Sequence, residues 1–140
     1  DYDIGIGAAL AGGVDVWLNN PRRHEEASGT SGMKVSGNGG INIGVLDGWW
    51  LEAYDGRNGW AIAPNNYEND SVTDSISMQN LIEHNVIPAF YDGREWERLV
   101  RRSLMLPSYF NTYRNLGQYM EIAYGLSLEE RIKQETLGEL

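Results

Sequence analysis

The residues best suited to chemistry gather in one short stretch of the sequence, from His24 to Gly40. It reads His-Glu-Glu-Ala-Ser-Gly-Thr-Ser-Gly-Met-Lys-Val-Ser-Gly-Asn-Gly-Gly, with two acids, small hydroxyl–glycine pairs and a single lysine. A glycine- and hydroxyl-rich loop that leads into a helix offers unpaired backbone N–H groups at the positive end of the helix dipole. The stretch therefore favours a loop that binds a phosphate or a polyhydroxylated ligand.

The spacing within this stretch differs from two common phosphate-binding motifs. The nucleotide P-loop ends in Gly-Lys-Ser/Thr, dinucleotide-binding folds carry Gly-x-Gly-x-x-Gly, and the stretch has neither pattern. A plain glycine-rich turn that caps a helix is the alternative interpretation.

Lys34 lies one helical turn inside the expected helix, and Glu25 and Glu26 lie before it. A partly desolvated amine can form a Schiff base with an aldehyde cofactor, or its ammonium can pair with a phosphate. The two acids can accept hydrogen bonds from sugar hydroxyls or take part in acid–base chemistry. A solvent-facing lysine, and acids selected only by the helix dipole, are the alternatives.

Strands are expected on both sides of the stretch. Val14–Leu18 is rich in β-branched and aromatic residues and predicts a buried strand that runs into the Asn19-Asn20-Pro21 turn. Ile41–Leu46 predicts a second strand, which ends at the turn signal Asp47-Gly48. Between them a helix is expected over about 31–38. Its predicted caps are Ser28, Thr30 or Ser31 at the start and Gly39-Gly40 at the end.

The remaining chain predicts mostly helices. They are expected over 1–13, 71–90, 94–105, 112–124 and 128–137. Ser71 and Asp74 resemble a capping box for the second of these helices, which Pro88 should kink or end. Residues 49–64 predict short extended pieces around two turns, and 65–70 a polar surface loop.

Two other groups of side chains have a structural interpretation. Trp49 and Trp50 are expected in a core or interface, with stacking on a sugar ligand as the alternative. Arg98, Arg101 and Arg102 predict a solvated basic face, with a phosphate site as the alternative.

Composition narrows the function classes. Acids outnumber bases by 20 to 11, and the net charge is -9. A nucleic-acid reader is therefore not expected, because phosphate backbones are bound by clustered Lys and Arg. The absence of cysteine and the two well-separated histidines disfavour a zinc site. The sequence has no apolar run long enough for a membrane span and no signal-peptide pattern, so no membrane association is expected.

A family resemblance rests on the central stretch and extends well beyond it. Glu26-Ala-Ser-Gly-Thr-Ser-Gly-Met-Lys34, followed by Asn38-Gly39 and Ile41-Asn-Ile-Gly-Val-Leu-Asp-Gly-Trp-Trp50, resembles the pyridoxal-phosphate lysine segment of the α-glucan phosphorylases. These are the glycogen, starch and maltodextrin phosphorylases. Val14-Asp-Val-Trp-Leu-Asn-Asn-Pro-Arg-Arg23 is similar to the short prokaryotic branch of that family. The likeness continues through Asn58–Ile62, Val86–Pro88, Trp96 and Phe110–Thr112.

The resemblance implies a role for each matched site residue. Lys34 matches the lysine that tethers pyridoxal 5'-phosphate, and Thr30 and Ser31 match the positions that hold its phosphate. Glu26, Ser28 and Gly29 match the positions that bind the glucosyl unit through its 3- and 4-hydroxyls. The implied reaction is phosphorolysis: inorganic phosphate cleaves the terminal α-1,4-glucosyl bond of a glucan and yields glucose 1-phosphate with retention. In that family the cofactor phosphate relays a proton, so Lys34 is a tether rather than a nucleophile.

The resemblance also implies an incomplete enzyme. Family members have two Rossmann-like domains, and this chain matches the C-terminal part of the second. We therefore expect an α/β fold with an incomplete sheet covered by several helices, as a single partial domain of residues 1–140. A glycine-rich, site-bearing half would span 1–64 and a helical half 65–140. The substrate-phosphate site and the N-terminal domains have no counterpart here. His24 stands where the family commonly has proline.

Further expectations concern the parent enzyme. It would be a cytoplasmic glycosyltransferase that forms a homo-oligomer. This chain alone would be a fragment or truncated product without activity. One alternative is a non-catalytic, self-associating structural fragment, because a missing part of the sheet would expose strand edges. The other is a cofactor-free sugar-nucleotide glycosyltransferase of the same fold.

Overall fold

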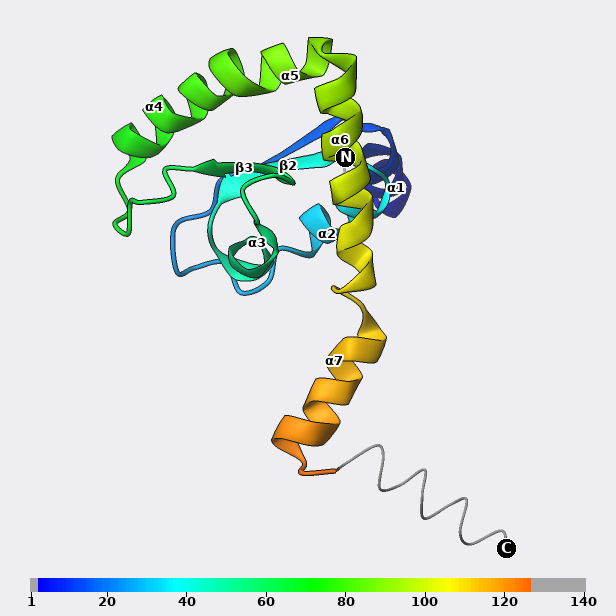
Figure 1. Ribbon diagram of the computed structural model, residues 1–140. Helices are drawn as coiled ribbons and strands as arrows, with labels where there is room; N and C mark the ends of the chain where they lie inside the picture. Colours follow the sequence, from blue (N-terminus) through cyan, green and yellow to red (C-terminus); the bar gives the residue numbers. More distant parts are fainter. Residues whose placement is uncertain (1–2, 127–140) are drawn as a thin grey trace, which may run out of the picture. The chain divides into compact units, whose positions relative to one another are not determined.

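The computed structural model describes residues 3–126, which form two compact units. The first unit extends to Pro107 and contains the sheet, and the second begins at Ser108 (Figure 1). The fold class is α/β, with a small open parallel sheet compatible with part of a Rossmann-like domain. No helix within the described residues is long and apolar enough to cross a membrane.

Three parallel strands form the sheet in the order β1-β2-β3. They are β1 (Val16–Asn19), β2 (Ile41–Val45) and β3 (Gly59–Ile62). The predicted β-loop-α-β unit is confirmed, with α2 (Thr30–Gly37) between the first two strands. The central strand β2 is buried along its whole length. The prediction that the first strand is buried is wrong, because β1 lies at an edge of this sheet and Leu18 is 47% exposed.

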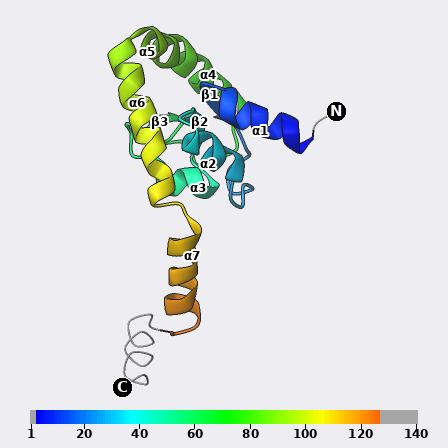
Figure 2. The same cartoon turned by 90° about the vertical axis from the view of Figure 1, so that its right-hand side faces the viewer.

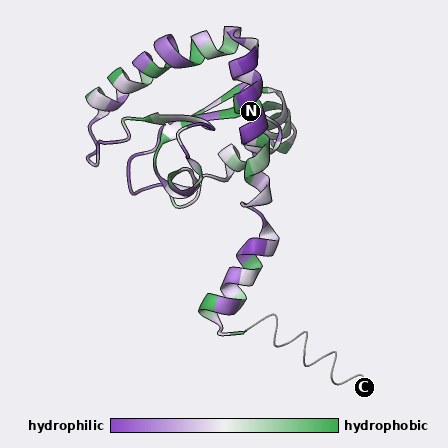
Figure 3. Ribbon diagram, viewed as in Figure 1, coloured by the Kyte–Doolittle hydropathy of each residue, from purple (hydrophilic) through white to green (hydrophobic). Residues whose placement is uncertain are grey.

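The two faces of β2 pack against different helices. Ile41, Ile43 and Val45 alternate along the strand and so share one face. This face is covered by the segment α4 (Ser71–Leu81), α5 (Ile87–Tyr91) and α6 (Gly93–Met105), which lies on one side of the sheet in Figure 1. Asn42 and Gly44 face the other way, toward α2 and α3 (Gly48–Ala53). Figure 3 shows mixed hydrophobic and hydrophilic colour along α4 and α6.

The short helix α3 was not expected, since residues 49–64 predicted only extended pieces. The Asp47 carboxylate caps α3 by accepting the Gly48 N–H, and the helix buries Trp49, Trp50 and Ala53. Burial of these side chains overrides the weak local preference for extended structure. Trp49 and Trp50 are 5% and 3% exposed, which confirms their interpretation as core residues. The extended prediction is correct for β3.

The capping box predicted for the helix at 71 is also wrong. Asp70 is the N-cap of α4 and accepts the N–H groups of Val72 and Thr73, while Asp74 is buried and paired with Arg23. The predicted kink is confirmed: α4 continues into a π-helical turn, η1 (Ile82–Val86), directly before α5. Pro88 in the first turn of α5 lacks an N–H, and a π-turn is a common local adjustment where the regular ladder is interrupted.

The outer helices follow the sequence predictions closely. α1 (Ile4–Gly13) is capped by Asp3, and Figure 2 shows it beside α2. α6 begins after its cap Asp92 and ends before the 3-10 turn η2 (Leu106–Ser108). The Ser103 hydroxyl of α6 donates a 2.6 Å hydrogen bond to the Gly40 carbonyl, just before β2. Arg98 and Arg101 form exposed ion pairs within α6, as expected for a solvated face, whereas Arg102 is half-buried and pairs with Asp55 at 3.3 Å.

Residues 108–126, the described part of the second unit, contain one continuous helical segment. α7 (Thr112–Gln118) is capped by Asn111 and continues as a π-helical turn, η3 (Tyr119–Ala123), so the helix predicted over 112–124 is confirmed. The guanidinium of Arg114 lies 3.8 Å from the centre of the Tyr109 ring. The helix predicted over 128–137 lies outside the described residues.

Candidate functional site

The glycine-rich stretch lies at the carboxyl edge of the parallel sheet. After β1 ends at Asn19, the chain forms a loop that returns to α2, and this loop contacts the segments that leave β2 and β3. The Glu26 N–H donates to Asp47 Oδ2 at 3.1 Å, and the Ser28 carbonyl accepts the Trp49 N–H at 2.8 Å. Ligands of open α/β sheets bind at this carboxyl edge, so the topology places the loop where a site is expected.

The N-terminus of α2 has no side-chain cap. The predicted caps Ser28, Thr30 and Ser31 are wrong: the N-cap is Gly29, in the left-handed region with φ 84°, and within residues 3–126 no side-chain cap bond is formed at this helix start. A Cβ at Gly29 would lie 3.0 Å from Glu26 Oε1 and 3.1 Å from Trp49 Cδ1, so glycine suits both the backbone and the space. First-turn N–H groups without a cap are available to an anion.

Asn42 and Trp49 hold α2 from behind. Asn42 is 4% exposed, and its Nδ2 donates to the Ser36 hydroxyl at 2.8 Å and to the Gly32 carbonyl at 3.3 Å. A Cβ at Gly32 would lie only 2.6 Å from Asn42 Oδ1 and 2.9 Å from Trp49 Cζ2. Sequence reasoning gave neither residue a role in the site. The one available signal was a lone polar residue, Asn42, within an otherwise apolar buried strand.

Lys34 and Ser31 line a pocket on the α1 side of α2. The pocket has a volume of about 250 Å³, and Lys34 supplies its one charged side chain. The apolar wall comes largely from α1 and from Trp17 of β1. Its full lining is Ile4, Gly7, Ala8, Leu10, Ala11, Trp17, Ser31, Lys34 and Val35. Lys34 is exposed, one turn beyond Ser31, so its amine can reach a ligand held at the start of the helix.

The predicted site residues thus fall into two groups. Glu26, Ser28, Gly29 and Thr30 lie together at the loop and helix start, whereas Ser31 and Lys34 lie along the pocket side of α2. The two acids differ in their contacts: Glu26 packs against Gly29 and Gly48, and Glu25 does not.

Asp47 braces the loop electrostatically. Burial raises the pKa of the Asp47 carboxyl. Hydrogen bonds from the backbone of Glu26, Gly48 and His24 lower it, as does the charge of His24. The lowering effects together are larger, so the pKa of Asp47 lies below 3.8. His24 has a φ of 68°, which a proline cannot adopt. The loop therefore follows a path here that depends on a non-proline residue at position 24.

Within residues 3–126 no group of three His, Cys, Asp or Glu side chains is placed to hold a metal ion.

Comparisons with known proteins give a consistent set of relatives, although no family model matches the chain. Over 138 residues the chain is 44% identical to the maltodextrin phosphorylase of Thermococcus litoralis and 38% identical to the glycogen phosphorylase of Aquifex aeolicus. It is 42% identical over 116 residues to a glycogen phosphorylase of Mycobacterium tuberculosis. These matches cover 94%, 93% and 74% of this chain but 17%, 20% and 13% of the relatives. The chain therefore spans a fifth or less of the length of these curated relatives.

Proposed function

We propose that this chain, which belongs to the family of glycogen and maltodextrin phosphorylases, supplies the cofactor tether and part of the glucosyl site of an α-glucan phosphorylase. The reaction would be phosphorolysis of terminal α-1,4-glucosyl units to glucose 1-phosphate. The observation that carries the proposal is the uncapped N-terminus of α2, with the amine of Lys34 one turn along the same helix. The phosphorylase names of the relatives support it, and nothing in them favours the structural or sugar-nucleotide alternatives.

The residues present fit pyridoxal 5'-phosphate. Lys34 is exposed on a pocket wall and would hold the cofactor's aldehyde carbon covalently. Thr30 and Ser31 would hold its phosphate through their hydroxyls and the uncapped first-turn N–H groups. When bound, the cofactor would supply a phosphate group able to exchange a proton with the substrate phosphate.

The loop before α2 would bind the glucosyl unit. The Glu26 carboxylate can accept hydrogen bonds from sugar hydroxyls, and the missing side chain at Gly29 leaves the backbone N–H open to a close approach. The Ser28 carbonyl already accepts the Trp49 N–H, so the hydroxyl and N–H of Ser28 are the groups left for substrate. These residues orient the sugar and do not themselves transfer a proton to the reacting bond.

The rest of the active site would come from parts of the enzyme that this chain does not span. They include the basic residues for the substrate phosphate and the N-terminal domains that complete the sugar pocket. We expect the chain alone to be inactive, and we expect the parent enzyme to be cytoplasmic and homo-oligomeric.

Borohydride trapping tests the proposal directly, because this chain contributes only two lysines, Lys34 and Lys133, to the full-length enzyme. Reduction of the holoenzyme followed by peptide mapping should leave a pyridoxyl group on Lys34. The Lys34→Arg variant should lose this adduct, and the matched Lys133→Arg variant should keep it. An adduct on Lys133, or none on either lysine, contradicts the assignment.

A further inference from the structure

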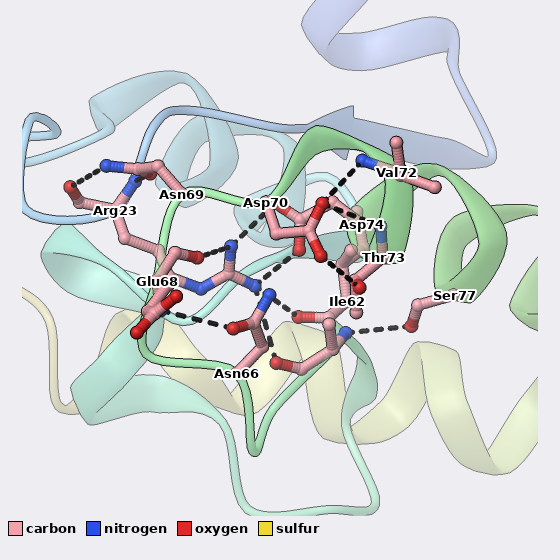
Figure 4. A network of polar contacts seen from close by, with 11 residues as sticks. Arg23, Ile62, Asn66, Glu68, Asn69, Asp70, Val72, Thr73, Asp74 and Ser77 are labelled. Carbon is pink, nitrogen blue, oxygen red and sulfur yellow. Dashed lines mark hydrogen bonds and ion pairs between the residues drawn. The ribbon is translucent and has the colours of Figure 1, made fainter.

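Arg23 has the most extensive polar contacts of any side chain near the loop, although the sequence gave it no role. It is only 5% exposed. Its two terminal nitrogens form a bidentate pair with Asp74, at 2.6 Å and 2.7 Å (Figure 4). The same nitrogens also donate to the carbonyls of Glu68, Ala63 and Ile62, at 3.2, 3.3 and 3.5 Å. The planar guanidinium is therefore satisfied on several sides, which a lysine ammonium cannot reproduce.

The backbone of Arg23 is held as firmly as its side chain. Its N–H donates to Asn69 Oδ1 at 2.6 Å, and its carbonyl accepts from Asn69 Nδ2 at 3.4 Å. Asn69 and Asp74 lie 46 and 51 residues further along the chain, in the loop after β3 and in α4. One residue of the site loop is thus joined to the segment 62–74 by two independent sets of contacts, as Figure 4 shows.

This attachment lies three residues before Glu26. The intervening turn is closed by the Glu25 N–H, which donates to the Arg22 carbonyl at 3.1 Å, and His24 adopts the left-handed region. On the other side, the Glu26 N–H is bonded to Asp47. With anchors on both sides and a tight turn between them, the Glu26 backbone has little freedom to shift while Arg23 stays in place.

The helix that bears Lys34 is supported by other residues. Asn42 donates to Ser36 and Gly32 of α2, and Trp49 packs against Gly32; neither Asn42 nor Trp49 is labelled among the residues of Figure 4. We propose that Arg23, through Asp74 and Asn69, is a positioning residue that sets the glucosyl-binding loop, whereas α2 and Lys34 depend mainly on Asn42 and Trp49. This inference rests on the proposed function, because it assigns Glu26, Ser28 and Gly29 to the sugar.

The test uses the holoenzyme and removes the network without leaving a buried charge. Removing only one partner would leave the other buried and unpaired, so the informative variant is the double change Arg23→Met with Asp74→Leu. We expect the KM for glucose 1-phosphate to rise about tenfold or more, with a smaller change in kcat, because a displaced loop weakens sugar binding. The yield of the borohydride-trapped adduct on Lys34 should equal that of the wild type. Arg23→Lys should give an intermediate KM.

Arg101→Met is the matched control, because Arg101 forms an exposed pair with Glu97 and is 75% exposed. It should leave both KM and adduct yield unchanged. An unchanged KM in the double variant overturns the positioning role. So does a parallel loss of adduct, activity and melting temperature, which would show a merely structural contact. Absence of the Lys34 adduct in the wild type would instead overturn the proposed function, so the two failures are distinguishable.

Discussion

The strand-and-loop region of residues 16–62 and the helical region of residues 71–105 differ in how far apart in sequence their stabilising contacts are. In the first, backbones approach one another so closely that several positions have no room for a side chain; a Cβ at Gly44, for example, would lie 2.9 Å from the Asn19 carbonyl oxygen. In the second, α4 and α6 are each capped by the aspartate just before them, and a Cβ at Gly93 would meet nothing within 4 Å. The first region therefore depends on contacts distant in sequence, and the surface of the second depends on local ones.

The largest expected difference between the two regions is in the stability lost on substituting a glycine in each. Gly59→Ala should be severely destabilising, by about 3 kcal/mol or more, because its Cβ would overlap the Asn42 carbonyl oxygen and its φ of 155° disfavours a side chain. Gly93→Ala should change the free energy of unfolding by about 0.5 kcal/mol or less. Urea unfolding followed by tryptophan fluorescence measures both. Equal effects at the two positions would remove the proposed difference between the regions.

A second prediction concerns the support behind α2. Asn42→Ala should cost about 1–3 kcal/mol, because it leaves the buried Ser36 hydroxyl without its Asn42 partner and removes packing against Gly32. The pyridoxyl adduct on Lys34 should form in lower yield, because α2 is then held less firmly. Urea unfolding and peptide mapping on the same preparation give both values. A wild-type yield together with wild-type stability would show that α2 is positioned by other contacts.

A third prediction compares one carboxyl from each region under acid. Asp70 accepts hydrogen bonds from the Thr73 side chain and from the N–H groups of Thr73 and Val72, which lower its pKa, and the pKa of Asp47 is lowered as well. A folded pKa below the ordinary 3.8 means that each charged carboxylate stabilises the fold above that pH, and that this contribution is lost as the pH falls through the lower folded value.

Asp47→Asn and Asp70→Asn should each flatten the loss of stability below pH 3.8, which urea unfolding at a series of pH values measures. Asparagine keeps an acceptor oxygen, so the cap geometry is retained while the charge is removed. Only Asp47→Asn should also affect the glucosyl loop, because its carboxylate accepts the Glu26 N–H. A steeper acid loss in either variant would contradict the lowered pKa.

The smallest effect on stability is expected from a substitution on the exposed face of α6. Arg101→Ala removes an i,i+4 pair with Glu97 in which the two side chains are 75% and 61% exposed. Such pairs contribute about 0.5 kcal/mol or less because solvent screens them. A change in melting temperature beyond the scatter of replicate scans would show that this face is not simply solvated.

Much of the architecture could be predicted because the relevant signals are local. The apolar run Ile41–Leu46 indicated β2, the glycines after Asn38 ended α2, and Pro88 marked the irregularity before α5. The site stretch could be located for the same reason, since its glycines, hydroxyls and lysine are contiguous in sequence. Its cofactor and substrate roles remain proposals.

Local sequence signals were enough to predict the order of most strands and helices and the position of the glycine-rich stretch, because periodicity, glycine and proline act over a few residues. The capping and ion-pair partners of individual residues depend on long-range packing, which local sequence signals do not reveal. Gly29 caps α2 in place of a hydroxyl because Trp49 and Glu26 fill the space that a side chain would need. Asp74 pairs with Arg23 in place of capping a helix because a buried guanidinium requires a buried carboxylate, and the fold brings together two residues that are 51 positions apart.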